Sequence, residues 1–209
     1  MSTDEEARVA ELRTGTLGVY EAIGRFVFAF SMFEFWMRQW MKMRFVEPQR
    51  WNEIGLLIAE TNGYQLVNPY FALCREVADL TDDEKRVGGK LREATIKEII
   101  EKRNNLMHGL WMPAALDDGN FAQLMRTKPA RAEPSTTDAY NAKEIDALTE
   151  TLTTIGNHVI EFGEICLTDH HGSARVSDFF TVSRGGAIER NGPKAAQRWQ
   201  SFLKPYLVY

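Results

Sequence analysis

The feature that most constrains the fold is a long apolar segment near the start of the chain, from Leu17 to Phe45. Apolar side chains surround most of its helical circumference, and this pattern predicts a central helix that is buried on most sides. Pro48 follows and ends the segment, because proline cannot continue a helix. The most apolar run, Phe26–Phe33, has eight residues between two charged side chains, which is too short to span a bilayer.

Composition is that of an ordinary globular protein, with 209 residues, 44% hydrophobic and 26% charged. The net charge of −4 gives no overall basic field of the kind that attracts nucleic acid. Only residues 172–209 are basic, with six Lys or Arg against two Asp or Glu. Cys74 and Cys166 lie among apolar neighbours without a C-x-x-C spacing, so we expect reduced, buried thiols in a cytoplasmic protein. The acidic N-terminus argues against a targeting peptide.

Capping and turn signals predict the remaining helices. Two short helices are expected near Arg50–Thr61 and Pro69–Leu80. A third begins at Thr81–Glu84, and Gly88-Gly89 is expected to form a joint before the next helix. Asn141-x-x-Glu144 is a capping box that opens the last long helix, whose apolar positions recur at alternating three- and four-residue spacing.

The middle of the chain predicts a β-hairpin. Leu110–Met112 and Phe121–Met125 flank the turn sequence D-D-G-N, and Thr127–Tyr140 contains two prolines and is expected to be an exposed loop. Together these elements predict an all-α fold, an up-and-down helical bundle with a small hairpin insertion. The expected organisation is an N-terminal arm over 1–16, a helical domain over 17–169 with the hairpin and loop at about 110–140, and a basic C-terminal extension over 170–209. The extension is expected to be loop-like, with a short helix after Pro193.

The predicted helix Ile96–Gly109 carries an unusual group of polar residues. Arg103 falls inside its apolar stripe, and Asn104 and His108 lie four residues apart on an adjoining face. Arginine is almost never buried without a partner, so Arg103 is expected to be paired or to line a cleft. Three polar groups therefore converge at the end of one otherwise apolar helix.

Glu34 is the corresponding anomaly in the first long helix. Its helical neighbours are mostly apolar, apart from Ser31, and a carboxylate in such surroundings needs a cationic partner. Pairing Glu34 with Arg103 satisfies both residues, and Arg38, one turn further on, is the alternative partner.

The sequence R-N-N-L-M-H, from Arg103 to His108, resembles the R-x4-6-H motif of the HEPN superfamily (higher eukaryotes and prokaryotes nucleotide-binding). In that family a polar residue often follows the arginine, as Asn104 does here, and an acidic residue often lies in the first long helix, as Glu34 does. The resemblance covers roughly residues 17–169. It implies an endoribonuclease that needs no metal or other cofactor and acts as a homodimer, with Glu34 and Ser31 supporting the site.

The residue types fit that chemistry. Cleavage of RNA by its own 2′-hydroxyl needs proton transfer and charge stabilisation at the phosphate. Histidine titrates near neutral pH, and arginine offers a permanently charged planar fork. His108 near a helix C-terminus is expected to serve as a general acid rather than a base, and Asn104 to orient it or to bind phosphate. Weaker RNA-binding candidates are Lys102, Arg126, Lys128 and Arg131.

These expectations define two classes of function. The first is a cytoplasmic RNA endonuclease, a toxin or phage-defence effector, whose partners are RNA, a second copy of the chain, and an antitoxin or another protein. The alternative is a non-catalytic helical dimer that binds a partner protein or nucleotide; Arg103 then forms a structural ion pair and His108 caps its helix. No cluster of carboxylates is spaced to hold a metal, and His170-His171 beside Asp169 is interpreted as a surface turn.

Overall fold

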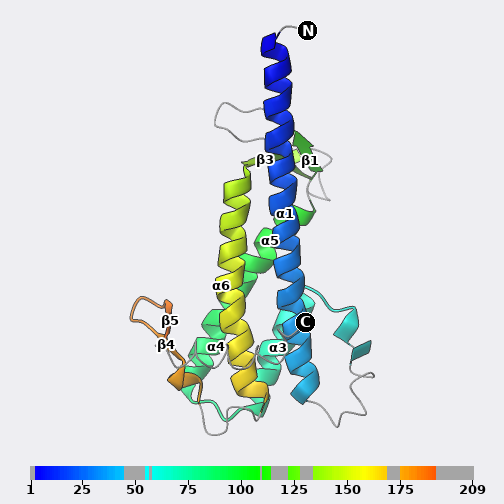
Figure 1. The fold of residues 1–209 in the computed structure, drawn as a ribbon. Helices are drawn as coiled ribbons and strands as arrows, with labels where there is room; N and C mark the ends of the chain where they lie inside the picture. Colours follow the sequence, from blue (N-terminus) through cyan, green and yellow to red (C-terminus); the bar gives the residue numbers. More distant parts are fainter. Residues whose placement is uncertain are drawn as a thin grey trace, which may run out of the picture. The chain divides into compact units, whose positions relative to one another are not determined.

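A computed structural model gives the arrangement of the chain and describes residues 3–44, 55–56, 58–108, 110–113, 122–127, 134–168 and 175–191 (Figure 1). These residues are mostly helical, as the sequence predicts, with short antiparallel strands. The chain forms two compact units, Met1–Phe33 with Ile96–Gly156 and Glu34–Thr95 with Asn157–Tyr209. The two longest helices, α1 and α6, each contribute to both units.

Helix α1, Thr3–Arg44, contains the long apolar segment, and the expected N-terminal arm forms its first turns from Thr3 onward (Figure 1). One side of α1 supplies core residues, including Phe26 and Phe30, whereas Phe28 on another side is 70% exposed. Within the described part of the chain, Asp4–Arg44 is long and apolar enough to cross a membrane by length and composition, a test that core helices of soluble proteins also pass. The absence of a membrane span stays a prediction.

In the first unit, α1 packs beside α6, Ala142–Leu167. Arg25 of α1 pairs with Asp146 of α6 at 2.9 Å. Further along, a Cβ on Gly156 would lie 3.2 Å from the ring of Phe33, so a small residue allows close packing there. Contacts advance in the same direction along both helices, which therefore run parallel in this unit.

The same unit contains a three-stranded antiparallel sheet of β1, Leu110–Pro113, β2, Ala122–Thr127, and β3, Pro134–Tyr140, in the order β1-β2-β3. The predicted hairpin is confirmed as β1 and β2, with Leu110 opposite Met125. The predicted loop over Thr127–Tyr140 is wrong for its second half, which pairs with β2 as β3. Threonine and tyrosine favour strands, and β3 covers what is otherwise an open edge of β2.

The middle helices are α3, Tyr64–Val77, α4, Asp82–Ala94, the π-helix η2, Thr95–Ile100, and α5, Glu101–Met107. The helix predicted over Pro69–Leu80 begins earlier than expected, directly after Gly63, whose positive φ of 49° makes the turn. Half of the residues of the helix expected near Arg50–Thr61 lie outside the described part of the chain.

The predicted joint at Gly88-Gly89 is wrong, because both glycines lie inside α4. A Cβ on Gly88 would lie 2.8 Å from the Phe162 ring, so this glycine allows α4 and α6 to approach each other. Gly163 has a similar role, since a Cβ there would overlap the Tyr70 hydroxyl, which donates to the Val159 carbonyl at 2.9 Å. These glycines are therefore packing positions rather than breaks.

The described part of the C-terminal extension packs onto the second unit. It contains the short 3₁₀-helix η3, Val176–Asp178, and an antiparallel hairpin of β4, Phe180–Val182, and β5, Ile188–Arg190. Phe180 is 1% exposed, so the predicted loop-like tail is wrong for residues 175–191. The helix expected after Pro193 lies outside the described residues.

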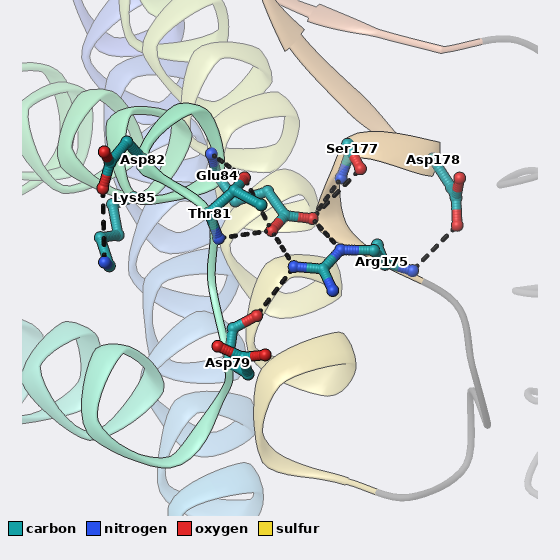
Figure 2. Close-up of polar contacts among 8 residues, drawn as sticks. All are labelled: Asp79, Thr81, Asp82, Glu84, Lys85, Arg175, Ser177 and Asp178. Atoms are coloured by element: carbon teal, nitrogen blue, oxygen red, sulfur yellow. Dashed lines mark hydrogen bonds and ion pairs between the residues drawn. The ribbon is translucent and has the colours of Figure 1, made fainter.

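A buried carboxylate joins this segment to α4. Glu84 is 1% exposed and, with Thr81, Arg175 and Ser177, forms what we name the Glu84 cluster. Figure 2 shows Arg175 donating to Glu84 Oε2 at 2.7 Å and to Oε1 at 3.2 Å, with Ser177 also donating to Oε1. The Thr81 backbone N–H donates to Glu84 at 2.8 Å, which confirms the helix start predicted at Thr81.

Electrostatics in this cluster favour the charged carboxylate. Burial by itself raises the pKa of Glu84, but the hydrogen bond from Arg175, with those from Thr81 and Ser177, outweighs burial and lowers the pKa from 4.5 to about 2. Elsewhere in the second unit, Cys74 and Cys166 are free and buried, as predicted. Burial raises the pKa of the Cys74 thiol, which therefore stays protonated near neutral pH.

Candidate active site

The three motif residues come together at the C-terminal end of α5, in the first unit. Arg103 Nη1 donates to Asn104 Oδ1 at 3.1 Å and lies 3.2 Å from His108 Nε2. We name this group the Arg103 cluster. The predicted convergence of Arg103, Asn104 and His108 is therefore present, formed by residues within a single helical turn and its cap.

An aromatic ring supports the guanidinium of Arg103. Its Cζ lies 5.3 Å from the centre of the buried Phe30 ring of α1, which is a cation–π distance. The side chain of Arg103 is half-buried, so its stem packs in the unit while its charged end reaches the cluster. Within the described residues, no carboxylate forms an ion pair with Arg103.

His108 is exposed and occupies the C-cap position of α5. Its backbone N–H donates to the Asn104 carbonyl at 3.1 Å, which holds the imidazole beside the last turn. Arginine has only donors, so in this contact Nε2 of His108 is the acceptor and Nδ1 carries the proton. In this geometry Nε2 faces Arg103, and the general-acid role expected from the helix position stays a prediction.

The π-helix η2 directly before α5 was not predicted from the sequence. Thr95, at its start, is fully buried and its hydroxyl donates to the Leu91 carbonyl at 2.7 Å. A π-helix turns the following residues relative to an α-helical register, and such segments are frequent at functional sites. The only sequence signal is a threonine followed by three isoleucines within six residues, which disfavours regular helix only weakly.

Trp111 closes the end of the motif helix. Its indole Nε1 donates to the Leu106 carbonyl at 2.9 Å, and its ring lies 5.6 Å from the ring of Tyr140 at the end of β3. Carbonyls in the last turn of a helix have no partner within the helix, and Trp111 satisfies one of them. The small sheet therefore holds the end of α5 in place.

Glu34 takes the alternative partner. In the second unit its carboxylate accepts from Arg38 Nη2 at 3.3 Å and from the backbone N–H of Gly63 at 2.9 Å, and Arg38 also donates to the Thr61 carbonyl. Arg38, the alternative partner offered by the sequence, is therefore the one found in this unit, and the Glu34–Arg103 ion pair stays a prediction. An i,i+4 pair on one helix needs no tertiary alignment, and an N–H at a turn supplies the second donor.

The remaining predicted residues are less informative. Ser31 and Lys102 are exposed, on α1 and next to Arg103 on α5. Arg126 lies in β2, and Lys128, Arg131 and the pair His170-His171 lie outside the described residues.

His158 on α6 is half-buried, with its ring edge-on to the ring of Phe180. Burial, with a smaller contribution from the charge of Arg190, lowers its pKa, so His158 is neutral at neutral pH. Within the described part of the chain, no group of three or more His, Cys, Asp or Glu side chains is placed to hold a metal ion.

Comparison with known proteins provides no independent assignment. No protein-family model matches the chain, and neither the curated proteins nor the solved structures contain a match. Any functional proposal therefore depends on the residues and geometry described above.

Proposed function

We propose that this protein is a HEPN-type endoribonuclease that cleaves RNA without a metal ion, and that its helical fold is a HEPN-like bundle. The observation that supports this proposal most directly is the contact of Arg103 Nη1 with both Asn104 Oδ1 and His108 Nε2. One cation, one amide and one imidazole are thereby held together at an exposed helix end. These groups can supply the proton transfer and the charge stabilisation that phosphodiester cleavage by the 2′-hydroxyl requires.

In the proposed reaction, Arg103 binds a non-bridging oxygen of the scissile phosphate. Its guanidinium has five N–H donors, and the contacts within the cluster come from Nη1, so among the described residues no acceptor competes with phosphate for Nε and Nη2. As the phosphate binds, Arg103 Nη1 leaves His108 Nε2, which then accepts the proton of the attacking 2′-hydroxyl. The new bond joins the 2′-oxygen to phosphorus, the bond to the 5′-oxygen breaks, and the products carry a 2′,3′-cyclic phosphate and a 5′-hydroxyl.

The departing 5′-oxygen needs a proton from another group. We propose that a second copy of the chain supplies it or orders a water that does, so the active form is a homodimer. Support comes from α1, where Leu17, Tyr20 and Phe28 are 53%, 48% and 70% exposed at positions that recur along one side of the helix. Exposed apolar surface of this kind is common at protein interfaces.

The decisive experiment incubates purified protein with total RNA in EDTA and analyses the ends of the products. Wild type is expected to cut, and His108→Ala to cut about 100- to 10,000-fold more slowly, because a positioned proton-transfer group is lost. Met107→Ala is the matched control, since Met107 is a partly exposed neighbour on the same helix end with no role in the cluster. Loss of wild-type activity in EDTA, or equal rates for wild type and His108→Ala, contradicts the proposal.

A second candidate is a non-catalytic helical dimer that binds a partner protein or nucleotide. The exposure of Phe28 favours it, because an interaction surface needs no reactive group. A folded dimer that cuts no RNA supports this candidate. The cellular role proposed for the nuclease is that of a cytoplasmic toxin or phage-defence effector, neutralised by an antitoxin or another protein partner.

A further inference from the structure

The second unit contains a pocket that the proposed nuclease activity does not use. It has a volume of about 400 Å³ and lies between α3, α4 and Phe162 of α6. Pockets that bind small ligands commonly have volumes of about 300–1,000 Å³. All of its lining residues belong to the second unit, whereas the Arg103 cluster belongs to the first.

The pocket combines cationic and apolar lining residues. Arg75, Lys85 and Arg92 line it, and no aspartate or glutamate is among its lining residues, all of which the structure describes. Phe71 and Phe162, 7% and 1% exposed, form part of its apolar wall. A ligand that fits both features has an anionic group attached to an apolar or aromatic ring.

The contacts of two of these cations, Arg92 and Lys85, leave their positive charge available to a ligand. Arg92 donates through Nε and Nη2 to a single neutral acceptor, Asn68 Oδ1, at 3.0 and 2.8 Å. Asn68 thus fixes the guanidinium without neutralising it. Lys85 reaches only the fully exposed carboxylate of Asp82, at 3.5 Å, and such a pair is weak in water. This differs from Arg175, whose charge is matched by buried Glu84.

Gly89 leaves one part of the pocket wall without a side chain. It lies inside α4, where glycine is less favourable than alanine, and it lines the pocket. A Cβ at Gly88 would press against Phe162, but a Cβ at Gly89 would meet no atom within 4 Å. Protein packing therefore explains Gly88 and does not explain Gly89. A missing side chain at a pocket wall allows a ligand to approach the backbone closely.

From these contacts we propose that the pocket binds a ring-bearing organic phosphate. The phosphate lies among Arg75, Lys85 and Arg92, with Asn68 holding Arg92, and the ring rests on the wall that includes Phe71 and Phe162. Arginine recognises phosphate oxygens through paired N–H donors, which a fixed guanidinium presents well.

The test is isothermal titration of the full chain with AMP and UMP, a purine and a pyrimidine nucleotide, beside inorganic phosphate and adenosine. Wild type is expected to bind at least one nucleotide at least tenfold more tightly than inorganic phosphate or adenosine. Arg92→Gln is expected to weaken binding at least tenfold, and Gly89→Met to abolish it by filling the pocket. Arg86→Gln, which removes a cation from the same helix outside the pocket, is expected to bind like wild type.

Two further variants separate this proposal from the nuclease. Arg103→Gln is expected to bind the nucleotide normally, and His108→Ala likewise, even where RNA cleavage is lost. If the melting curve shows that Gly89→Met is unstable, Gly89→Ala replaces it, because its small side chain is expected to preserve the fold. Failure of both nucleotides to bind wild type, equal binding of inorganic phosphate, or loss of binding in Arg103→Gln but not in Arg92→Gln overturns the proposal.

Discussion

The Glu84 cluster and the Arg103 cluster use arginine in opposite ways. In the Glu84 cluster, Arg175 donates to a carboxylate that is 1% exposed, so the two charges cancel. In the Arg103 cluster, the arginine donates to a neutral amide oxygen and contacts an imidazole nitrogen. An arginine with neutral partners keeps its charge available for an incoming anion, whereas a neutralised arginine fixes the structure.

The two clusters also differ in how far apart their residues lie in the chain. Arg103, Asn104 and His108 lie within six residues, so the local helix alone brings them together. Arg175 and Glu84 are 91 residues apart, and their contact requires the C-terminal segment to pack onto α4. A cluster of residues that are close in sequence needs little ordering of the chain. A cluster of residues that are far apart in sequence forms only when the chain folds, and its contacts then stabilise the fold.

The largest expected effect is on stability at Glu84. Glu84→Ala leaves Arg175 and Ser177 without their shared acceptor and removes the capping box, so we expect it to lower the free energy of unfolding by about 3–5 kcal/mol. Asp83→Ala is the matched control, because Asp83 is an exposed acid one residue earlier, paired only with Arg86. Urea melts measure both variants. Equal losses would show that the cluster is not a stabilising centre.

The reverse pattern is expected at Arg103. Arg103→Gln is expected to reduce RNA cleavage about 100- to 1,000-fold, the usual effect of losing one stabilising donor. Its effect on the free energy of unfolding is expected to stay below about 1 kcal/mol, since the cation–π contact with Phe30 is the main structural interaction lost. Rate measurements and urea melts on the same preparation separate the two effects.

Lys102→Gln, which removes the exposed neighbouring cation, serves as the control for Arg103 and is expected to cut nearly as fast as wild type. Severe destabilisation by Arg103→Gln would place Arg103 with the structural arginines and would favour the non-catalytic candidate.

The elements that depend on a few neighbouring residues could be predicted from the sequence. The helix start predicted at Thr81 and the capping box predicted at Asn141 are both present, and the carboxylates of Glu84 and Glu144 each accept from the backbone N–H of the cap residue. The motif cluster was also predictable, because its residues lie within six positions at the end of one helix. The β1–β2 hairpin followed from its turn sequence.

Features that depend on distant partners could not be predicted. From sequence alone, Gly88 resembles a helix break, because its contact with Phe162 comes from a distant part of the chain. Similarly, the sequence does not choose between two arginine partners for Glu34, and the N–H of Gly63 that also binds Glu34 comes from another helix start. The Glu84–Arg175 pair joins segments whose sequences give no sign of each other. The boundaries predicted at residues 16 and 169 depend on such contacts too, and remain predictions.

Acid should weaken the Glu84 cluster in a defined range. The pKa of Glu84 in the folded chain is about 2, below the ordinary value of 4.5. As the pH falls, the unfolded chain therefore binds the proton first. The contribution of this group is fully present above pH 4.5 and is lost as the pH falls towards 2, by about 3 kcal/mol in total. Urea melts between pH 6 and pH 2.5 measure the slope of the free energy of unfolding against pH.

Glu84→Gln removes the titrating group, so its stability should vary less over the same pH range. Glu144→Gln changes an exposed carboxylate in the other capping box and should keep the wild-type slope. A wild-type slope in Glu84→Gln would assign the acid sensitivity to other carboxylates.

The smallest effect compares the two capping boxes directly. Asn141 Oδ1 accepts from the Glu144 N–H at 3.0 Å, and we expect Asn141→Ala to cost about 1 kcal/mol. Thr81 Oγ1 accepts from the Glu84 N–H at 3.3 Å and also donates to the buried Glu84 carboxylate at 3.0 Å, so Thr81→Ala should cost more, about 2 kcal/mol. Urea melts monitored by circular dichroism resolve this difference. If Thr81→Ala costs no more than Asn141→Ala, the hydroxyl adds nothing to the buried carboxylate, and Arg175 and Ser177 alone stabilise its charge.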